Sequence, residues 1–353
     1  MRTEQNRIEY LDALRGLTML LVILGHVSFY NLGVDGGQAG NIHAYLRQIR
    51  LPLFFFVSGF LLYKKEFVWN LSNTIIFLKK KFIVQILSPF LFLSCYIVCK
   101  ELPYIETITL PGKAGYWFTF ALFNYFVLYI ALRKIFDAMK FKENNTLIVL
   151  LFIGVALYYL PTIDILTYIH VPQKILNLSS IGYILYFFFF AFGIYTRRNF
   201  KIFEKIINGS SLLAIVIILF FTLHIFVDTN GTDYITKFLN KSKNITLGIC
   251  GIIIVFSLFK KQEQFFASNN YIATTFKYIG KRTLDIYLLH YFFLTPNLSK
   301  IFPFFAEHNL PIIEFTVSLI MGIIIIGASL IISSILRLNN TMAHYLFGVK
   351  KKK

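Results

Sequence analysis

Charged residues are scarce in this sequence, and acidic residues are the scarcer of the two kinds. Only 15% of the 353 residues are charged, whereas 57% are hydrophobic, and 17 Asp and Glu stand against 35 Lys and Arg. A soluble domain typically has about 25% charged residues, so this composition excludes an ordinary soluble protein. Together with the mean hydropathy of +0.65, it indicates an integral membrane protein.

Cysteine is also rare, and histidine forms no cluster along the chain. Cys95, Cys99 and Cys250 lie in apolar runs and show no spacing typical of a disulfide framework or a metal site. Most histidines lack neighbouring metal ligands in the sequence, namely His43, His170, His224, His308 and His344. We therefore expect no metal cofactor.

Long apolar runs, in contrast, are abundant. Ten of them are long enough, or nearly so, to cross about 30 Å of hydrocarbon, which predicts an all-α polytopic membrane bundle of about ten transmembrane helices. The runs cover residues 11–31, 49–63, 82–99, 114–132, 146–160, 181–196, 211–227, 244–259, 275–294 and 312–335. No connecting segment is long enough for a separate domain, so we expect a single transmembrane domain over residues 1–353.

The basic residues indicate the orientation of these helices. If the N-terminus is inside, the inner connecting segments carry about three times as many Lys and Arg residues as the outer ones. Both termini are therefore expected in the cytoplasm. The basic clusters at 79–81, 197–198 and 350–353 lie at helix ends, where they face anionic membrane lipids, so we expect no nucleic-acid partner.

The first apolar run contains ionisable residues that a simple membrane anchor does not need. Within YLDALRGLTMLLVILGHV, residues 10–27, lie Asp12, Arg15 and His26. Eleven residues place His26 within about 20° of Arg15 around a helix and about 16 Å further along its axis. Such residues in a membrane helix usually mark function. The alternative is structural: Arg15 reaches the interface, Asp12 caps the helix and His26 is hydrogen-bonded inside the bundle.

Three further motifs follow in order along the chain. Arg50 precedes the Phe-rich sequence FFFVSGF, residues 54–60, and Trp117 and Phe118 form an aromatic pair in a later run. The penultimate run contains GKRTLDIYLLH, residues 280–290. With LDALRG and His26, these motifs resemble the acyltransferase 3 family of bacterial multi-pass membrane acyltransferases over nearly the full chain. Many members have several arginines before a proline in the third helix, where this chain has Lys79–Lys81 before Pro89.

The resemblance implies an enzyme of the bacterial cytoplasmic (inner) membrane. It implies transfer of an acyl group, acetyl by family habit, from cytoplasmic acyl-CoA to a sugar hydroxyl. The acceptor partner would be a cell-surface polysaccharide or a lipid-linked glycan. Acyl-CoA is then the donor substrate, and surface O-acetylation is the outcome.

Each motif residue receives an expected role from this chemistry. Arg15 suits a phosphate of the donor, because a guanidinium binds phosphate through paired hydrogen bonds. His26 is expected to act as general base on the acceptor hydroxyl. Asp285 is expected either to pair with Arg282 or to orient His26. The remaining expected contacts are Lys81 and Arg282 with the donor, and Trp117 and His290 with the acceptor. Arg50 is expected to hold a phosphate of the acceptor or to stabilise a developing oxyanion.

Several alternatives remain open at this stage. Arg50 and His290 also fit simple anchoring at the membrane interface. Covalent catalysis by Ser28 or Ser58 competes with direct transfer, but neither serine has an evident base partner in the sequence. Glu314 begins the last apolar run, where an acid suits the helix dipole, so we leave it outside the site. A glycan or lipid transporter with Arg15, Arg50 and Asp285 along its pathway is the alternative function, although no inverted repeat is visible.

Overall fold

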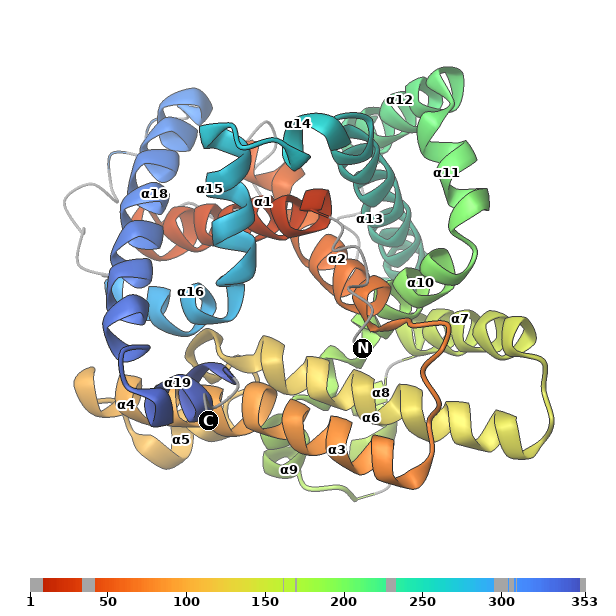
Figure 1. Cartoon of the computed structure of the whole chain (residues 1–353), viewed down its shortest axis with the longest axis horizontal. Coiled ribbons are helices and arrows are strands. Elements are labelled where there is room, and N and C mark those ends of the chain that lie inside the picture. The colour runs from red at the N-terminus through yellow and green to blue at the C-terminus, as the bar shows by residue number, and fades with distance from the viewer. Residues whose placement is uncertain are drawn as a thin grey trace. The chain divides into compact units, whose positions relative to one another are not determined.

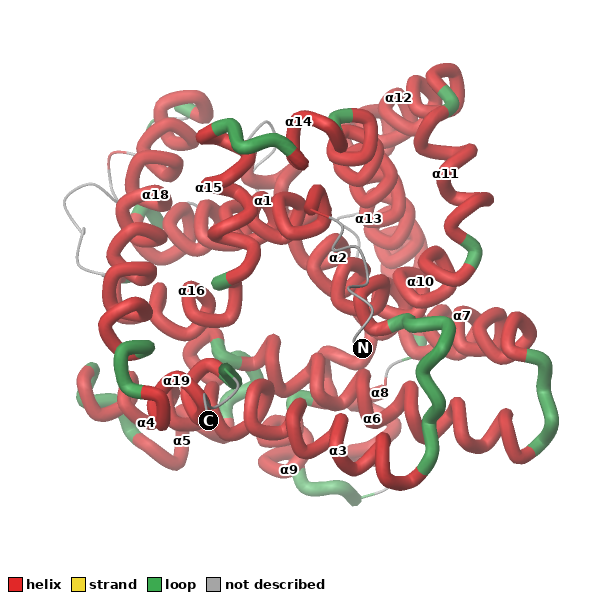
Figure 2. The backbone as a smooth tube through the Cα atoms, in the orientation of Figure 1, coloured by secondary structure: helices red, strands yellow, loops and turns green. Residues whose placement is uncertain are grey.

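The structure is a computed structural model, and it describes residues 9–33, 42–160, 162–168, 170–226, 233–294, 304, 308 and 310–349. Within these ranges every regular element is a helix and none is a strand, as Figure 2 shows. The predicted all-α class is therefore confirmed for the described residues. The basic cluster predicted at 350–353 lies outside them.

The chain forms two compact units. Unit 1 comprises residues 1–54 and 200–331, and unit 2 comprises residues 55–199 and 332–353. Two of the three boundaries fall inside long helices, α2 (Ile42–Leu62) and α18 (Pro311–Leu336), and the third falls between Asn199 and Phe200. A single transmembrane domain over residues 1–353 stays a prediction.

The helices are labelled in Figure 1. Unit 1 holds α1 (Glu9–His26), η1 (Val27–Asn31), the first part of α2 (Ile42–Leu62), α11 (Phe200–Asn208), α12 (Ser210–Phe226), α13 (Tyr234–Lys261), α14 (Glu263–Ala267), α15 (Tyr271–Lys281), α16 (Thr283–Leu289), η5 (His290–Phe293) and most of α18 (Pro311–Leu336). Unit 2 holds the rest of α2, α3 (Leu71–Phe82), η2 (Ile83–Leu87), α4 (Ser88–Cys99), α5 (Tyr104–Thr109), η3 (Lys113–Gly115), α6 (Trp117–Ala138), α7 (Glu143–Tyr159), α8 (Thr162–Tyr168), α9 (Gln173–Ser179), η4 (Ile181–Tyr186), α10 (Phe187–Arg198), the end of α18 and α19 (Asn340–Phe347).

Among the described residues, six helical stretches are long and apolar enough to cross a membrane. They are Glu9–Asn31, Ile42–Leu62, Leu71–Cys99, Trp117–Ala138, Tyr234–Lys261 and Pro311–Leu336. Two bent pairs raise the number to as many as 8: Gln173–Ser179 with Ile181–Arg198, and Phe200–Asn208 with Ser210–Phe226. The predicted count of about ten is not confirmed.

The two remaining predicted spans differ from long straight helices for physical reasons. The fifth run folds as α7, whose 17 residues are at the short limit for crossing a bilayer. The ninth run breaks at Arg282, where φ is −114° and ψ is 18°, into α15 of 11 residues and α16 of 7 residues. Neither half is long enough to span a bilayer alone.

Helix α1 packs against α13, α14, α15 and α16 in unit 1, and it lies beside α15 in Figure 1. Two glycines permit the approach to α15. A Cβ atom added to Gly16 would lie 2.2 Å from the carbonyl oxygen of Phe276, and one added to Gly280 would lie 1.7 Å from that of Asp12. Small residues allow two membrane helices to bring their backbones this close. The contact fixes the face that α1 presents to the segment after α15.

Aromatic rings form the core of unit 2. All four residues of the run Phe187–Phe190 in α10 are buried. Phe55 packs within 5.0 Å of Tyr125, ring centre to ring centre, and Tyr125 packs within 5.8 Å of Phe187. The Phe run therefore belongs to the packed interior of this unit.

Candidate active site

His26 and His290 form a hydrogen-bonded pair in unit 1. Nδ1 of His26 lies 2.9 Å from Nε2 of His290, and the two rings stack with centres 5.1 Å apart and planes 5° from parallel. His290 is fully buried, whereas His26 is partly exposed. Helix α1 contributes His26 at its last residue, and η5 contributes His290 at its first residue.

The surrounding groups fix the tautomer of each ring. Nδ1 of His290 lies 3.1 Å from the carbonyl oxygen of Ile286, and a carbonyl oxygen only accepts, so this nitrogen carries a proton. A neutral His290 then has an unprotonated Nε2 that accepts the Nδ1–H of His26. His26 in turn keeps the lone pair of its Nε2. No described residue hydrogen-bonds this nitrogen, so it is the proton acceptor that the pair offers to a substrate.

Arg50 brings a guanidinium next to His26. A Cβ atom added to Gly25 would lie 1.1 Å from Nη1 of Arg50, so the guanidinium occupies the space that any larger residue at this position would need. Gly25 directly precedes His26 in α1. A permanent positive charge therefore lies beside the histidine, where it can stabilise negative charge that develops on an oxygen.

Arg15 projects towards the same short segment as His26. Its Nη2 donates to Oγ1 of Thr283 at 2.9 Å, and its Nη1 lies 3.7 Å from Oδ1 of Asp12. Thr283 begins α16, and His290 directly follows the end of that helix. Arg15 and His26 thus contact the two ends of one segment, as their eleven-residue spacing predicts.

Asp285 forms an ion pair inside this segment. Its Oδ2 lies 3.3 Å from Nη1 of Arg282, with the Asp285 side chain 1% exposed and that of Arg282 20% exposed. This is one of the two arrangements expected from the sequence. The hydrogen bond that the structure describes at Nδ1 of His26 is made with Nε2 of His290 and not with Asp285. Because both ring nitrogens of buried His290 are engaged, its placement favours a role in orienting His26 over the expected contact with the acceptor.

A second buried polar cluster follows His26 along the chain. Ser28 lies in η1, one π-helical stretch that directly continues α1, and its Oγ donates to Oε1 of Glu314 at 2.7 Å. Nε2 of His43 lies 3.5 Å from the same carboxylate oxygen. All three side chains are buried. Sequence reasoning left Glu314 outside the site. An available signal was its position in the apolar sequence PIIEFTVSLI, where a carboxylate needs a polar partner.

Comparison with known proteins decides the family. A family model described as an acyltransferase domain, that of the acyltransferase 3 family, matches residues 8–336, nearly the whole chain. The chain belongs to this family. No curated protein and no solved structure matches it. The family and the long apolar helices together support an integral multi-pass membrane acyltransferase.

The other expected site residues of this acyltransferase lie in unit 2. The Nζ of Lys81 lies 4.2 Å from the ring centre of Phe126, in a cation–π contact. Trp117 stacks on Tyr183, with ring centres 3.7 Å apart and planes at 18°. Both contacts are internal to unit 2. The predicted roles of Lys81 and Trp117 stay predictions.

Lys113 is a buried lysine that the sequence did not predict to be buried. Lys113 is 1% exposed, donates from Nζ to Oγ of Ser180 at 2.9 Å, and also donates to the carbonyl oxygen of Asn177 in the last turn of α9. Burial lowers the pKa of Lys113 to about 8. A cation at a helix C-terminus is favourable, which accounts for the position without a catalytic role.

Among the residues that the structure describes, no three His, Cys, Asp or Glu side chains gather closely enough to hold a metal ion.

Proposed function

We propose that this membrane acyltransferase transfers an acyl group from cytoplasmic acyl-CoA to a sugar hydroxyl of a cell-surface polysaccharide or lipid-linked glycan, with His26 as general base. The observation that supports the proposal best is the His26–His290 pair. It leaves one imidazole nitrogen unprotonated and partly accessible at the end of α1. Acetyl is the acyl group that follows from the resemblance to the family.

In this reaction His26 acts first as a general base and then as a general acid. Nε2 of His26 takes the proton from the acceptor hydroxyl as its oxygen attacks the thioester carbonyl carbon. The new C–O bond forms, the C–S bond breaks, and the thiolate of CoA leaves. The imidazolium then returns the proton to the thiolate, so the enzyme is unchanged. General-base help of this kind contributes about 10² to 10⁴ in rate.

Charged residues on either side of His26 suit the charges of the reactants. The guanidinium of Arg50, packed against Gly25, is near enough to the histidine to stabilise the oxyanion of the tetrahedral intermediate. Arg15, about 16 Å along the helix from His26, holds a phosphate of the donor. Direct transfer needs no nucleophilic serine, and the Ser28 hydroxyl already donates its hydrogen bond to the Glu314 carboxylate.

The test compares surface glycans by mass spectrometry in cells without the protein, with the wild type, and with His26→Ala. We expect the acyl mass increment only with the wild type, at equal protein levels in the membrane fraction. His308→Ala serves as the matched control because His308 is exposed. A full acyl increment with His26→Ala would refute the general base, and identical glycans with and without the wild type would refute the acceptor class.

The donor is tested separately on purified protein. Acetyl-CoA should bind the wild type and should bind Arg15→Ala about tenfold or more weakly, because a charge-assisted phosphate contact is lost. Equal binding by both proteins would remove Arg15 from the donor site. Absence of any binding to the wild type would favour the transporter over the enzyme.

A further inference from the structure

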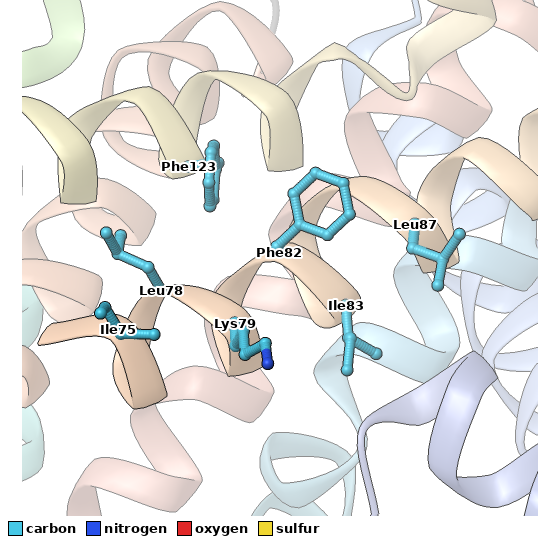
Figure 3. A pocket seen from close by; sticks show the side chains of 7 residues that line it. All are labelled: Ile75, Leu78, Lys79, Phe82, Ile83, Leu87 and Phe123. Carbon is cyan, nitrogen blue, oxygen red and sulfur yellow. The ribbon is translucent and has the colours of Figure 1, made fainter. Parts of the chain in front are cut away.

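A hollow of about 500 Å³ opens on the surface of unit 2, along α3 and η2. Figure 3 shows its lining, which consists of Ile75, Leu78, Lys79, Phe82, Ile83, Leu87 and Phe123. All but Phe123 recur at the spacing of one helical face over α3 and η2. From Lys79 to Leu87 this face is about 12 Å long, most of the roughly 15 Å of hydrocarbon in one leaflet.

The floor and edges of the hollow are apolar. Phe82 meets Phe123 of α6 edge to face, with ring centres 6.0 Å apart. Ile75 is 49% exposed and Phe82 is 48% exposed, so both present large apolar surface outward. The hollow lies on Leu71–Cys99, one of the stretches apolar enough to cross a membrane. An apolar hollow in that setting suits a lipid chain, because the hydrocarbon of a bilayer contains no water to fill it.

One charged group distinguishes this hollow from plain lipid-facing surface. Lys79 is exposed and, among the described residues that line the hollow, alone carries a charge. Figure 3 shows its side chain between Ile75 and Ile83. Within the described part of the chain no carboxylate pairs with Lys79. Lys79, Lys80 and Lys81 together end α3, and a cluster of lysines at a membrane surface attracts anionic headgroups.

We propose that this hollow binds one acyl chain of an anionic phospholipid, with the headgroup phosphate at Lys79. The apolar face takes the chain, and the ammonium group takes the phosphate. The site is separate from acyl transfer: its occupant is a resident membrane lipid, and neither His26 nor any other residue of the proposed mechanism lines it.

The experiment measures lipid retention by native mass spectrometry. The full-length protein is released from nanodiscs of phosphatidylglycerol and phosphatidylcholine in equal amounts, with identical acyl chains. We expect the wild type to retain phosphatidylglycerol preferentially. Lys79→Gln should lower that preference about fivefold, the size expected for one lysine beside an anionic lipid. Lys80→Gln is the matched control, because it removes the same charge from the next residue, which does not line the hollow.

A second variant tests the chain-binding face. Ile83→Trp fills the hollow and should lower retention of both lipids, whatever their headgroup. Equal losses from Lys79→Gln and Lys80→Gln would overturn the proposal in favour of diffuse surface charge. Displacement of retained phosphatidylglycerol by palmitoyl-CoA at equal concentration would also overturn it, since the hollow would then belong to the donor. Inorganic phosphate alone should displace nothing, because it offers no acyl chain.

Discussion

The two units bury different kinds of side chain. Among the described residues, the buried acids, histidines and lysines of unit 1 are Asp12, His43, Lys277, Asp285, His290 and Glu314, whereas Lys113 is the one such residue in unit 2. The largest fully buried side chains show the opposite distribution, because all of them except Tyr10 belong to unit 2. A buried charge is costly unless it has a partner, so a protein retains it for a reason. We infer that unit 1 carries the chemistry and that unit 2 is a packed aromatic scaffold.

Of the substitutions that test this difference between the units, we expect one at His290 to lower activity most. His290→Ala removes the hydrogen bond to Nδ1 of His26 and should lower kcat about 100-fold, the upper range for loss of an orienting partner. KM for the acceptor should stay nearly constant. His290→Gln, whose side-chain oxygen can still accept from Nδ1, should recover part of the loss. A raised acceptor KM with little change in kcat would instead return His290 to the acceptor site.

A smaller effect is expected at Gly25. The Cβ of Gly25→Ala would collide with the Arg50 guanidinium at 1.1 Å and displace it from its place beside His26. We expect kcat to fall about tenfold, less than for outright removal of an oxyanion donor because the charge can resettle nearby. Gly327→Ala is the matched control, since its Cβ would meet nothing within 4 Å. Equal kinetics for the two variants would show that the position of Arg50 does not matter.

The stacking of Trp117 on Tyr183 tests whether unit 2 is only a scaffold. If unit 2 is a scaffold, Trp117→Leu should destabilise the protein by about 1 kcal/mol through lost stacking on Tyr183, and Trp117→Phe should do so less. The activity of the folded fraction should be unchanged. Thermal unfolding and acceptor kinetics measured together decide the matter. A raised acceptor KM at unchanged Tm would place part of the acceptor site in unit 2.

The smallest effect is expected at Lys113 and depends on pH. Burial lowers the pKa of Lys113 to about 8 from the ordinary 10.5, so between these values the unfolded chain binds more protons than the folded one. The free energy of unfolding therefore rises as pH increases through this window. Tm should be a few degrees higher at pH 9.5 than at pH 7.5 in the wild type. Lys113→Met should lose this difference, and a variant that keeps it would contradict the assignment.

The apolar pattern predicted much of the fold. Run length located the helices that begin near Glu9, Trp117 and Pro311, because a membrane helix needs a minimum of apolar length. The break at Arg282 was harder to predict from the sequence. Charged residues in an apolar run indicate strain or function, but they do not show at which residue the helix ends. The bend before Ile181 could not be predicted from the sequence either. It occurs at Ser180, whose φ is 58°, and not at a glycine or proline.

Part of the site was predicted from the sequence. Relations between residues close in the sequence were predicted, whereas contacts between distant residues were not. Arg15 and His26 lie on one helix, so helical period alone relates them. The pairing of His26 with His290 joins residues 264 positions apart, and no local pattern encodes it. The Ser28–Glu314 hydrogen bond joins residues 286 positions apart, and the favourable dipole position of Glu314 gave a sufficient local reason to set it aside. Long-range polar partners are what the structure adds.

Gly16 and Gly280 have a consequence for how this chain can change over time. Each glycine faces the main chain of the opposite helix rather than a side chain. A smaller residue on the opposite helix therefore cannot make room for a larger residue at either position, because every amino acid has the same carbonyl group there. We expect the two positions to remain glycine independently of each other in descendants of this sequence, with no compensating pair of substitutions available to selection.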